Sequence, residues 1–319
     1  MTVFENFPLS DIIYYGIGGK ARFVLRVQNK KDLLEALEFI RTKKIKKVLT
    51  VGFGSNLLVS DSFFNGAVLW FCRAEFPQIK FLENGLVKVF AGENLDDVIQ
   101  FSFQHNLIGL EWAGGLPGTI GGGIRGNVGA FGGEIKNSIE KVEVFDIITN
   151  EIKVLDNKDL KFSYRNSYVK ENKNLIVVNA FFKLSKANEK ELAQAKKIYF
   201  SHIDYRKKNH PLDYPSCGSV FKNITDKENV ERILNVWPDI KEQTEDKWHG
   251  KVAMGYVINR LGFSGKTYGG AQVAEKHANY ILNKNNATFN DVETLIQEIK
   301  DKFNKTFGFY PEVEVEIIS

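Results

Sequence analysis

Two glycine-rich loops have the composition of an anion-binding site. Residues 111–135 contain ten glycines and few side chains large enough for a core, and residues 52–57 form a second Gly/Ser/Asn loop between apolar runs. Glycine allows a backbone to turn sharply or to approach a ligand closely. Successive backbone N–H groups in such a loop can hold a phosphate without any helix. Two loops about sixty residues apart therefore suit an elongated ligand with a diphosphate in its middle.

Neither loop matches a standard nucleotide-binding motif. Gly121, Gly123 and Gly126 have G-x-G-x-x-G spacing, but the dinucleotide motif needs a strand before it and a helix after it, and no helical periodicity follows here. A Walker loop at residues 14–21 fails because Ala21 stands where Ser or Thr is required. Each loop alone could be a tight turn, and only the pair favours a ligand.

The cysteines and histidines give little support for nucleophilic or metal chemistry. Cys217 could act as a nucleophile with a histidine base, but no cysteine-hydrolase signature surrounds it, and sequence position alone says nothing about its pKa. The other cysteine, Cys72, forms no C-x-x-C pair with it, and the five histidines lack metal-binding spacing. We therefore expect no disulfide framework and no metal site.

The composition is that of a folded protein with a small-molecule ligand. A chain of 319 residues should form two or three domains at roughly 100 to 200 residues each. The net charge of +4 is too diffuse for nucleic acid but favours an anionic substrate. No apolar run is long enough to span a membrane, and residues 1–9 lack a secretory signal. We expect a cytoplasmic monomer without nucleic-acid or membrane partners.

Hydrophobic periodicity predicts alternating helices and strands. The first region is βαβ-like, with a helix at 30–44 and a strand at 48–51. A Lys/Ala-rich helix that ends before Pro211 marks the candidate domain boundary. Further helices are predicted at 95–105, 189–208, 251–261 and 291–303, and further strands at 67–71, 86–90, 142–146, 175–179, 280–283 and 313–318.

Eight segments in order resemble the UDP-N-acetylenolpyruvoylglucosamine reductases, a family of flavoenzymes in peptidoglycan precursor synthesis. The resemblance covers nearly the whole chain. The segments are Ile17-Gly-Gly19, Gly52-Phe-Gly-Ser-Asn-Leu-Leu-Val59, Gly115-Leu-Pro-Gly-Thr-Ile-Gly-Gly122, Asn127-Val-Gly-Ala130, Tyr164-Arg-Asn-Ser167, Cys217-Gly-Ser-Val-Phe-Lys-Asn223, Gly270-Ala-Gln-Val273 and Pro311-Glu-Val313.

The resemblance implies an α+β fold with an FAD-binding region of the vanillyl-alcohol-oxidase (PCMH) type. That region would span residues 1–209 in two α/β subdomains, about 1–66 and 67–209. A smaller α/β substrate-binding domain would follow at 210–319, with the C-terminal strand returning to the active site.

The same resemblance implies which residues bind the cofactor FAD, which NADPH would reduce. Both glycine loops would wrap the FAD diphosphate. The residues are Gly52, Gly54, Ser55, Asn56, Leu57, Gly115, Pro117, Gly118, Thr119, Gly121, Gly122, Asn127, Gly129 and Ala130.

The implied reaction reduces an enolpyruvyl ether on a UDP-sugar to a lactyl ether. Reduced flavin N5 gives hydride to the vinyl carbon, charge gathers on the substrate carboxylate, and the α-carbon is protonated. Arg165 matches the family residue that stabilises the carboxylate. Ser219 matches the proton donor, with Lys222 or a water chain as the expected helper.

Glu312 matches the family glutamate that holds the carboxylate or assists its protonation. To help a carboxylate it should be protonated or share a proton, and burial against an apolar wall would raise its pKa accordingly. Four further residues match substrate-contacting positions, namely Tyr164, Lys222, Asn223 and Gln272.

Some features depart from the family pattern and leave two alternatives open. Residues 225–250 form a longer charged link than usual, and no counterpart of the extra tyrosine loop is seen, so the chain looks like the shorter subtype. One alternative is another FAD-dependent sugar or alcohol oxidoreductase on this scaffold, although no histidine for flavin attachment lies in either loop. The other is a nucleotide-sugar binding protein without catalysis.

Overall fold

The computed structural model describes residues 1–319, which divide into two compact units. Unit 1 comprises Met1–Phe7, Ala21–Phe53 and Phe64–Lys208, and unit 2 comprises Pro8–Lys20, Gly54–Phe63 and Asn209–Ser319. The last division lies one residue before the expected boundary at 209/210. Two short segments of the N-terminal half also group with unit 2, because Gly19 and Ser60 join them to each other by a 2.9 Å backbone hydrogen bond and β4 pairs with the C-terminal strand.

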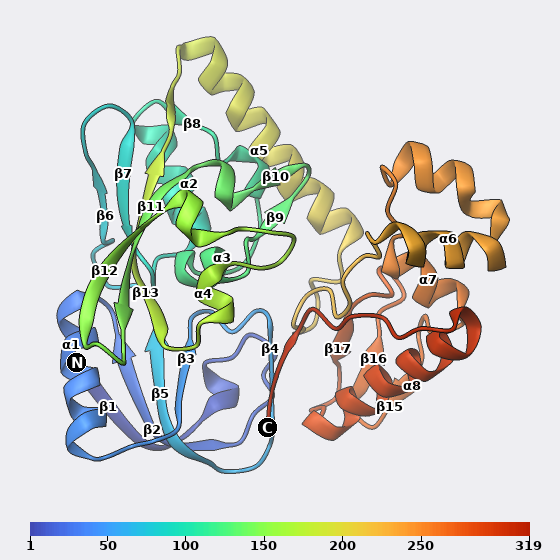
Figure 1. Ribbon diagram of the computed structural model, residues 1–319, viewed down its shortest axis with the longest axis horizontal. Coiled ribbons are helices and arrows are strands. Elements are labelled where there is room, and N and C mark those ends of the chain that lie inside the picture. Colours follow the sequence, from blue (N-terminus) through green and yellow to red (C-terminus); the bar gives the residue numbers. More distant parts are fainter. The chain divides into compact units, whose positions relative to one another are not determined.

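The βαβ arrangement predicted for the first region is present in unit 1. A four-stranded sheet has the order β1 (Thr2–Pro8), β2 (Lys20–Val27), β5 (Phe64–Phe71) and β3 (Val48–Val51), and both β2 and β3 run parallel to β5 (Figure 1). Helix α1 (Lys30–Thr42) connects β2 to β3. Asn29 caps it by accepting the backbone N–H of Asp32, and Leu33 and Ala36 are buried.

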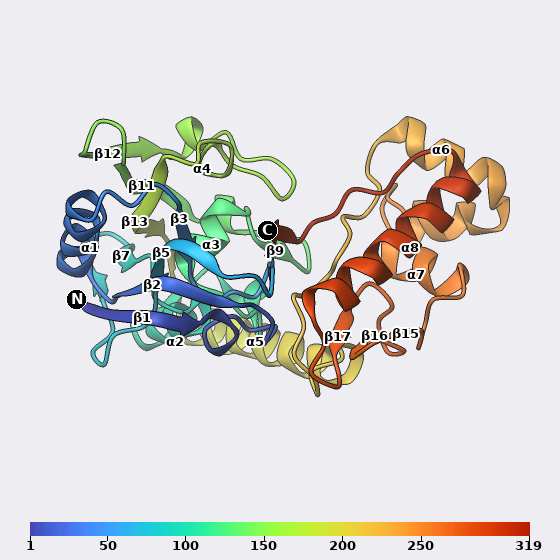
Figure 2. The same cartoon turned by 90° about the horizontal axis from the view of Figure 1, so that it is seen from below.

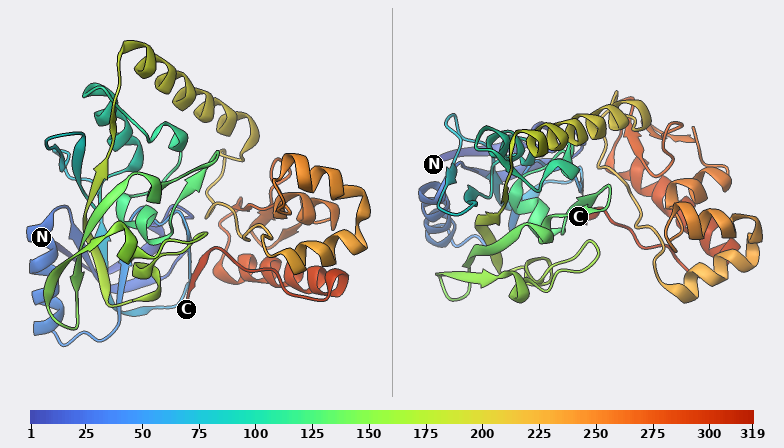
Figure 3. Two further views of the ribbon diagram at one scale, coloured as in Figure 1. Left: turned by 45° about the horizontal axis from the view of Figure 1, so that its top comes forward. Right: turned by 90° about the horizontal axis from the view of Figure 1, so that it is seen from above.

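A second, antiparallel sheet shares the core of unit 1. Its order is β12 (Glu151–Asp156), β11 (Ile139–Asp146), β13 (Leu175–Lys183), β7 (Leu86–Phe90) and β6 (Ile79–Phe81). The side chains from Ile176 to Phe182 are buried, which explains the continuous apolar run in the central strand β13. Helix α2 (Leu95–Gln104) and the long helix α5 (Glu189–Asn209) complete this unit (Figures 2 and 3).

The glycine-rich stretch contains a short helix that its sequence pattern did not predict. Helix α3 (Ile120–Arg125) begins at Thr119 and buries Ile120 and Ile124, which lie four residues apart on one face. Around it are η2 (Glu111–Ala113), β9 (Gly129–Ala130), β10 (Gly133–Glu134) and η3 (Ile135–Asn137). The helix forms because burial of two isoleucines and a threonine cap outweigh the poor helix propensity of glycine.

The smaller elements of unit 1 carry or support loops. They are β8 (Leu107–Ile108), β14 (Ser185–Lys186), η4 (Asn157–Leu160) and α4 (Tyr168–Glu171). Strand β14 pairs with β8. Ser167 caps α4 by accepting the backbone N–H of Lys170.

Unit 2 packs helices with a small antiparallel sheet, β15 (Thr267–Tyr268), β16 (Ala271–Val273) and β17 (Ile281–Asn283) (Figure 1). Helix α8 (Phe289–Phe307) has a capping box of Thr288 and Asp291 and buries a continuous apolar stripe. Strand β4 (Leu57–Val59) pairs in parallel with β18 (Glu316–Ile318), and η1 (Leu9–Asp11) lies in the N-terminal segment of this unit.

The charged link at residues 225–250 is folded. It forms α6 (Lys227–Val236), η5 (Pro238–Ile240) and a π-helical turn at Gln243–Lys247, and α7 (Met254–Arg260) follows. The Trp237 ring packs edge-on against Phe307 of α8, with ring centroids 4.8 Å apart, and Arg260 lies over Trp237. This link therefore forms part of the body of unit 2. No helix of the chain has the length and apolar character of a membrane span.

Candidate functional site

The two glycine loops meet in unit 1. A Cβ atom at Gly52 would overlap Thr119 Oγ1, so only glycine allows the first loop to approach the second. Thr119 is buried and its hydroxyl accepts the backbone N–H of Gly122 at 3.4 Å. Gly121 donates its N–H to Ala91 O at 2.9 Å and lies too close to Ala91 for a side chain to fit comfortably. Within unit 1, Gly52 at the start of the first loop therefore lies directly against the second loop.

Neither the backbone conformation nor the packing of the protein requires glycine at position 122. It is exposed, its φ is negative, and a Cβ there would meet only Thr119 Oγ1 at an ordinary 3.5 Å. In a helix such a glycine costs about 1 kcal/mol relative to alanine. The open space at Gly122 is thus available for the close approach of a ligand, and this feature fits a bound FAD.

The remainder of the first loop belongs to unit 2. Gly54 has φ +68 and lies so near the backbone of Ile13 that no side chain would fit. The Asn56 carbonyl accepts the N–H of Glu316 at 3.0 Å, and its side-chain amide donates to Glu314 O at 3.3 Å. Asn56 therefore ties this loop to the C-terminal strand, and Leu57 begins β4. Ser55 lies between Gly54 and Asn56.

The rest of the predicted cofactor residues lie around α3 in unit 1. Gly115 has φ +70 and packs against Arg206 of α5, while the Gly118 carbonyl accepts the N–H of Leu95. Pro117 is exposed between them. Gly129 and Ala130 form β9, which pairs with β10 across a turn in which Phe131 and Gly132 both have positive φ.

Arg165 occupies a backbone conformation that arginine rarely adopts. Its φ is +55, and it lies in a tight turn closed by hydrogen bonds in both directions between Ser163 and Asn166. A non-glycine residue held in the left-handed region costs about 1 kcal/mol or more and often marks a functional position. The turn aims the guanidinium at the glycine stretch, where Nη2 donates to Gly129 O at 2.9 Å and the group lies over the Tyr164 ring.

Asn127 joins the same turn to the glycine stretch from the other side. It is fully buried at φ +41, its Nδ2 donates to Ser163 O at 2.9 Å, and its Oδ1 accepts the N–H of Lys136. Ser167 Oγ also donates to Arg125 O at 2.8 Å. The structure therefore brings Tyr164 and Arg165 to the predicted cofactor loop, and gives Asn127 a positioning role.

Three residues near this stretch were missed by the sequence reasoning. Phe131 stacks on His202 with centroids 3.9 Å apart and planes 2° from parallel, and Arg206 lies over the same ring. Arg206 Nε also donates to Gly114 O at 3.1 Å. The signal was the i, i+4 spacing of His202 and Arg206 on a predicted helix, which places them on one face.

In unit 2, Ser219 is presented by a clamped segment. Gly218 turns the chain with φ +78, and the next residues, Val220 and Phe221, are buried. On one side Glu314 N donates to Val220 O at 2.8 Å, and Phe221 forms an antiparallel bridge with Val313. The Ser219 segment is thus paired with the C-terminal segment that carries Glu312.

Lys222 and Glu312 form an ion pair beside this segment, and the N–H of Lys222 donates to Glu312 O at 2.9 Å. The Glu312 side chain is 69% exposed, whereas that of Lys222 is 15% exposed. The apolar wall expected around Glu312 is therefore absent, because the C-terminal segment presents this side chain outward and only its backbone pairs with the buried chain.

The two remaining predicted substrate residues also have partners in unit 2. Asn223 Oδ1 accepts the N–H of Met254 at 3.0 Å and so caps α7. Gln272 Oε1 accepts a hydrogen bond of 2.7 Å from Lys284 Nζ, and its Nε2 donates to Gly265 O at 3.1 Å. Gln272 thus holds a cation that the sequence reasoning did not single out.

Cys217 is placed where it cannot serve as a nucleophile. It is buried, and burial raises the pKa of its thiol to about 12. The Tyr15 hydroxyl donates to Ile281 O at 2.8 Å, and burial raises the pKa of Tyr15 well above its ordinary value. A thiol protonated throughout the physiological range lacks the thiolate that nucleophilic chemistry needs.

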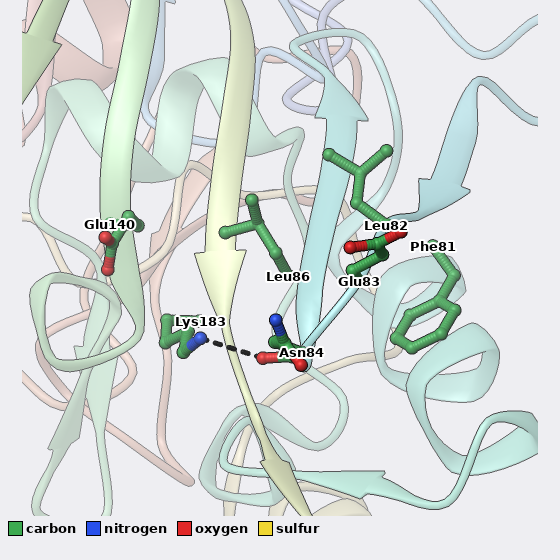
Figure 4. Close-up of a pocket in the computed structure, with 7 residues that line it drawn as sticks. All are labelled: Phe81, Leu82, Glu83, Asn84, Leu86, Glu140 and Lys183. Carbon is green, nitrogen blue, oxygen red and sulfur yellow. Dashed lines mark hydrogen bonds between the residues drawn. The ribbon is translucent and has the colours of Figure 1, made fainter.

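An open surface depression in unit 1 lies away from the glycine loops. Residues from the β6–β7 turn line it with others from β11 and β13, and Lys183 Nζ donates to Asn84 O at 2.8 Å across it (Figure 4). Leu86 at the start of β7 lines the depression, while Ala91 beyond the end of β7 contacts α3. The depression and the predicted site therefore lie at opposite ends of β7.

Comparisons with known proteins identify both parts of the chain. The model of the C-terminal domain of UDP-N-acetylenolpyruvoylglucosamine reductase matches residues 210–318, and a model of an FAD binding domain matches residues 21–155. The crystal structure of the reductase MurB from Thermus caldophilus superposes with a TM-score of 0.75 at 25% identity, covering 100% of this chain and 98% of the other. The expected fold class is confirmed.

Curated relatives match over the full length. The UDP-N-acetylenolpyruvoylglucosamine reductase of Fusobacterium nucleatum is 32% identical over 318 residues, covering 100% of both chains. That of Listeria monocytogenes is 34% identical over 313 residues, covering 98% of this chain and 94% of the relative. That of Caldicellulosiruptor bescii is 33% identical over 314 residues, covering 98% and 90%. The chain therefore belongs to the UDP-N-acetylenolpyruvoylglucosamine reductase family of oxidoreductases and carries an FAD-binding domain.

Proposed function

We propose that the protein uses NADPH to reduce the enolpyruvyl ether of UDP-N-acetylglucosamine enolpyruvate, giving UDP-N-acetylmuramate. The observation that carries the proposal is the surface where Gly52 meets Thr119 and where Gly122 leaves space that no protein atom fills. Family membership supports the same substrate.

The residues around this surface fit FAD. Backbone N–H groups of the two glycine loops would hold its diphosphate, because glycine leaves no side chains to cover this backbone. When bound, FAD supplies the hydride that it receives from NADPH and that the vinyl carbon of the substrate accepts. We assign the FAD-binding role to residues 1–209 and the substrate-binding role to residues 210–319.

Arg165 is proposed to stabilise the negative charge that develops on the substrate carboxylate. A planar guanidinium can donate two parallel hydrogen bonds to a carboxylate. The strained turn fixes its position in advance, so little reorganisation is needed as charge builds up.

Ser219 is proposed to donate the proton to the substrate α-carbon. The carbon of an enediolate is basic enough to take a hydroxyl proton when a cation stabilises the resulting alkoxide. Lys222 is three residues away on the clamped segment and pairs with Glu312, which supports a role for this ion pair in holding a cation near the hydroxyl. Tyr164, Asn223 and Gln272 are proposed to contact the sugar and diphosphate.

A flavin spectrum tests the cofactor, and half-reactions test the chemistry. The purified chain should be yellow, release free FAD on heating, bleach with NADPH without oxygen, and regain its colour when the enolpyruvyl sugar is added. A colourless protein would contradict FAD binding. A yellow protein that the sugar cannot reoxidise would favour another flavin oxidoreductase. Size-exclusion chromatography tests the proposed monomer.

Ser219→Ala separates the reductase from a binding protein. We expect flavin reduction by NADPH to be retained, because the hydroxyl acts only in the second half-reaction. Reoxidation by the enolpyruvyl sugar and product formation should fall by about 10² to 10⁴-fold, the usual contribution of a positioned general acid. Stopped-flow absorbance of the flavin and product analysis measure the two steps. Normal product formation in this variant would assign the proton to another donor.

A further inference from the structure

The segment that carries Ser219 contains a bulge against β17 and the turn that precedes it. Ser216 bridges Leu282, and the N–H of Val220 donates to Asn279 O at 2.7 Å. Four residue steps separate Ser216 from Val220, whereas three separate Leu282 from Asn279. The stretch from Ser216 to Val220 therefore has one residue more than the stretch it faces. Gly218, with φ +78, lies in this stretch. A bulge of this kind changes the direction of a side chain.

One side chain closes the bulge. Asn279 is buried, its Oδ1 accepts the N–H of Phe221 at 2.9 Å, and its Nδ2 donates to Phe221 O at 2.8 Å. Together with the backbone bond to Val220, Asn279 makes three hydrogen bonds to the two residues that follow Ser219. On the opposite edge of this segment, the N–H of Lys222 donates to Glu312 O and the N–H of Glu314 donates to Val220 O, and the Lys222 side chain pairs with that of Glu312.

We infer that Asn279 is a positioning residue that sets the direction of the Ser219 hydroxyl, an inference that rests on the proposed function. The carboxamide suits this task because it offers a donor and an acceptor at once to the C=O and the N–H of the same residue, Phe221. Alanine would leave the buried N–H and C=O of Phe221 unpaired, and such groups are costly in a protein interior. The bulge would then relax and Ser219 would lose its fixed direction.

The test measures each half-reaction of the FAD-loaded protein by anaerobic stopped flow. In Asn279→Ala, flavin reduction by NADPH should be unchanged, while reoxidation by UDP-N-acetylglucosamine enolpyruvate should slow by about 10²-fold, the effect of displacing a reacting group by about 1 Å. Hydrogen exchange should show loss of protection at the amide of Phe221, a readout that does not depend on activity.

Asn283→Ala is the matched control. Asn283 is the last residue of β17, four residues after Asn279, and also makes two side-chain hydrogen bonds, from Nδ2 to Tyr15 O and from the N–H of Ala287 to Oδ1. Asn283→Ala therefore loses hydrogen bonds of the same kind but keeps both hydrogen bonds between Asn279 and Phe221. Its reoxidation rate should match that of the unmodified protein.

Asn279→Asp serves if the alanine variant does not fold, because it preserves the shape of the side chain. Its carboxyl can donate to Phe221 O only when protonated, so reoxidation should recover as the pH is lowered while Asn283→Ala shows no such recovery. Equal rates for Asn279→Ala and the unmodified protein, or equal loss of both half-reactions, would overturn the inference. If the unmodified protein itself is not reoxidised by this sugar, the proposed function fails instead.

Discussion

At the scale of single residues, backbone strain distinguishes Arg165 from the other arginines. The sequence motif selects this residue only through resemblance, and an exposed arginine after a strand is ordinarily without function. In the structure it has φ +55 and a hydrogen bond to Gly129 O. At this position the backbone conformation costs less free energy for glycine than for arginine, yet the residue is arginine.

Arg165→Gly should therefore separate stability from activity. We expect the free energy of unfolding to stay the same or rise by about 1 kcal/mol, because glycine relieves the left-handed strain. Substrate-driven reoxidation of the flavin should fall by about 10² to 10³-fold, as for the loss of one preorganised charge-stabilising donor. Denaturant unfolding and stopped flow measure the two effects.

Lys161→Gly is the control, since Lys161 is exposed and also has a positive φ, of +44. It should gain stability to a similar extent with no change in either half-reaction. Wild-type reoxidation in Arg165→Gly would remove Arg165 from the reaction.

At the scale of elements, helix α3 combines poor helix-forming residues with a function that needs them. Gly121 and Gly123 are tightly packed, against Ala91 and against Val128 and Ile135 respectively. Gly122 faces open space and has no such reason. Helix stability is thus given up at a position where, in the proposed function, FAD comes close to the backbone.

Gly122→Ala should stabilise the apoprotein and weaken FAD binding. The free energy of unfolding should rise by up to about 1 kcal/mol, because alanine is the better helix former and meets no clash. FAD affinity, measured by flavin fluorescence during titration, should fall because the added methyl occupies the approach to the backbone.

The control is Gly126→Ala at the end of the same helix, where a Cβ would meet only Gly122 O at 3.6 Å. This change should leave FAD affinity unaltered. If Gly122→Ala binds FAD as tightly as the unmodified protein, the cofactor does not approach α3 at this point.

At the scale of the whole molecule, a buried carboxyl in unit 1 should make its unfolding depend on pH. Glu93 is fully buried behind α3. Its Oε1 accepts the N–H of Gln78 at 2.8 Å, and its backbone carbonyl accepts the N–H of Ile120. Burial raises the pKa of this carboxyl above 4.5, and Asp97 adds to the effect. Oε2 has no hydrogen-bond partner.

Because the folded pKa lies above the unfolded one, the folded state holds the Glu93 proton more tightly. This contribution to stability is fully present below the unfolded pKa and is lost as the pH rises through the folded value. Glu93→Gln preserves the acceptor for Gln78 and removes the charge, so it should raise the melting temperature at pH 7 and have little effect near pH 4. Scanning calorimetry at both pH values checks this, and a variant less stable at pH 7 would show that Glu93 is held as a useful charge.

Hydrophobic periodicity and turn residues predicted the longer helices and several strands of this protein from sequence alone, but not β1, β2 or α6. In the predicted elements, apolar residues recur at the spacing that places them on one buried face of a helix or strand. The helices predicted in this way are α1, α2, α5, α7 and α8. Eight ordered motifs likewise determined the family, because their joint spacing is far more specific than any one of them.

Only the tertiary structure decided how the site residues are held. The contact of Gly52 with Thr119, the hydrogen bonds of Asn279 to Phe221 and the outward position of Glu312 join residues that lie far apart in the chain. The helix within the glycine stretch also depends on distant partners, since the isoleucines that stabilise it are buried in the core of unit 1. Local sequence records propensity, whereas burial and hydrogen-bond pairing between distant segments exist only once the chain has folded.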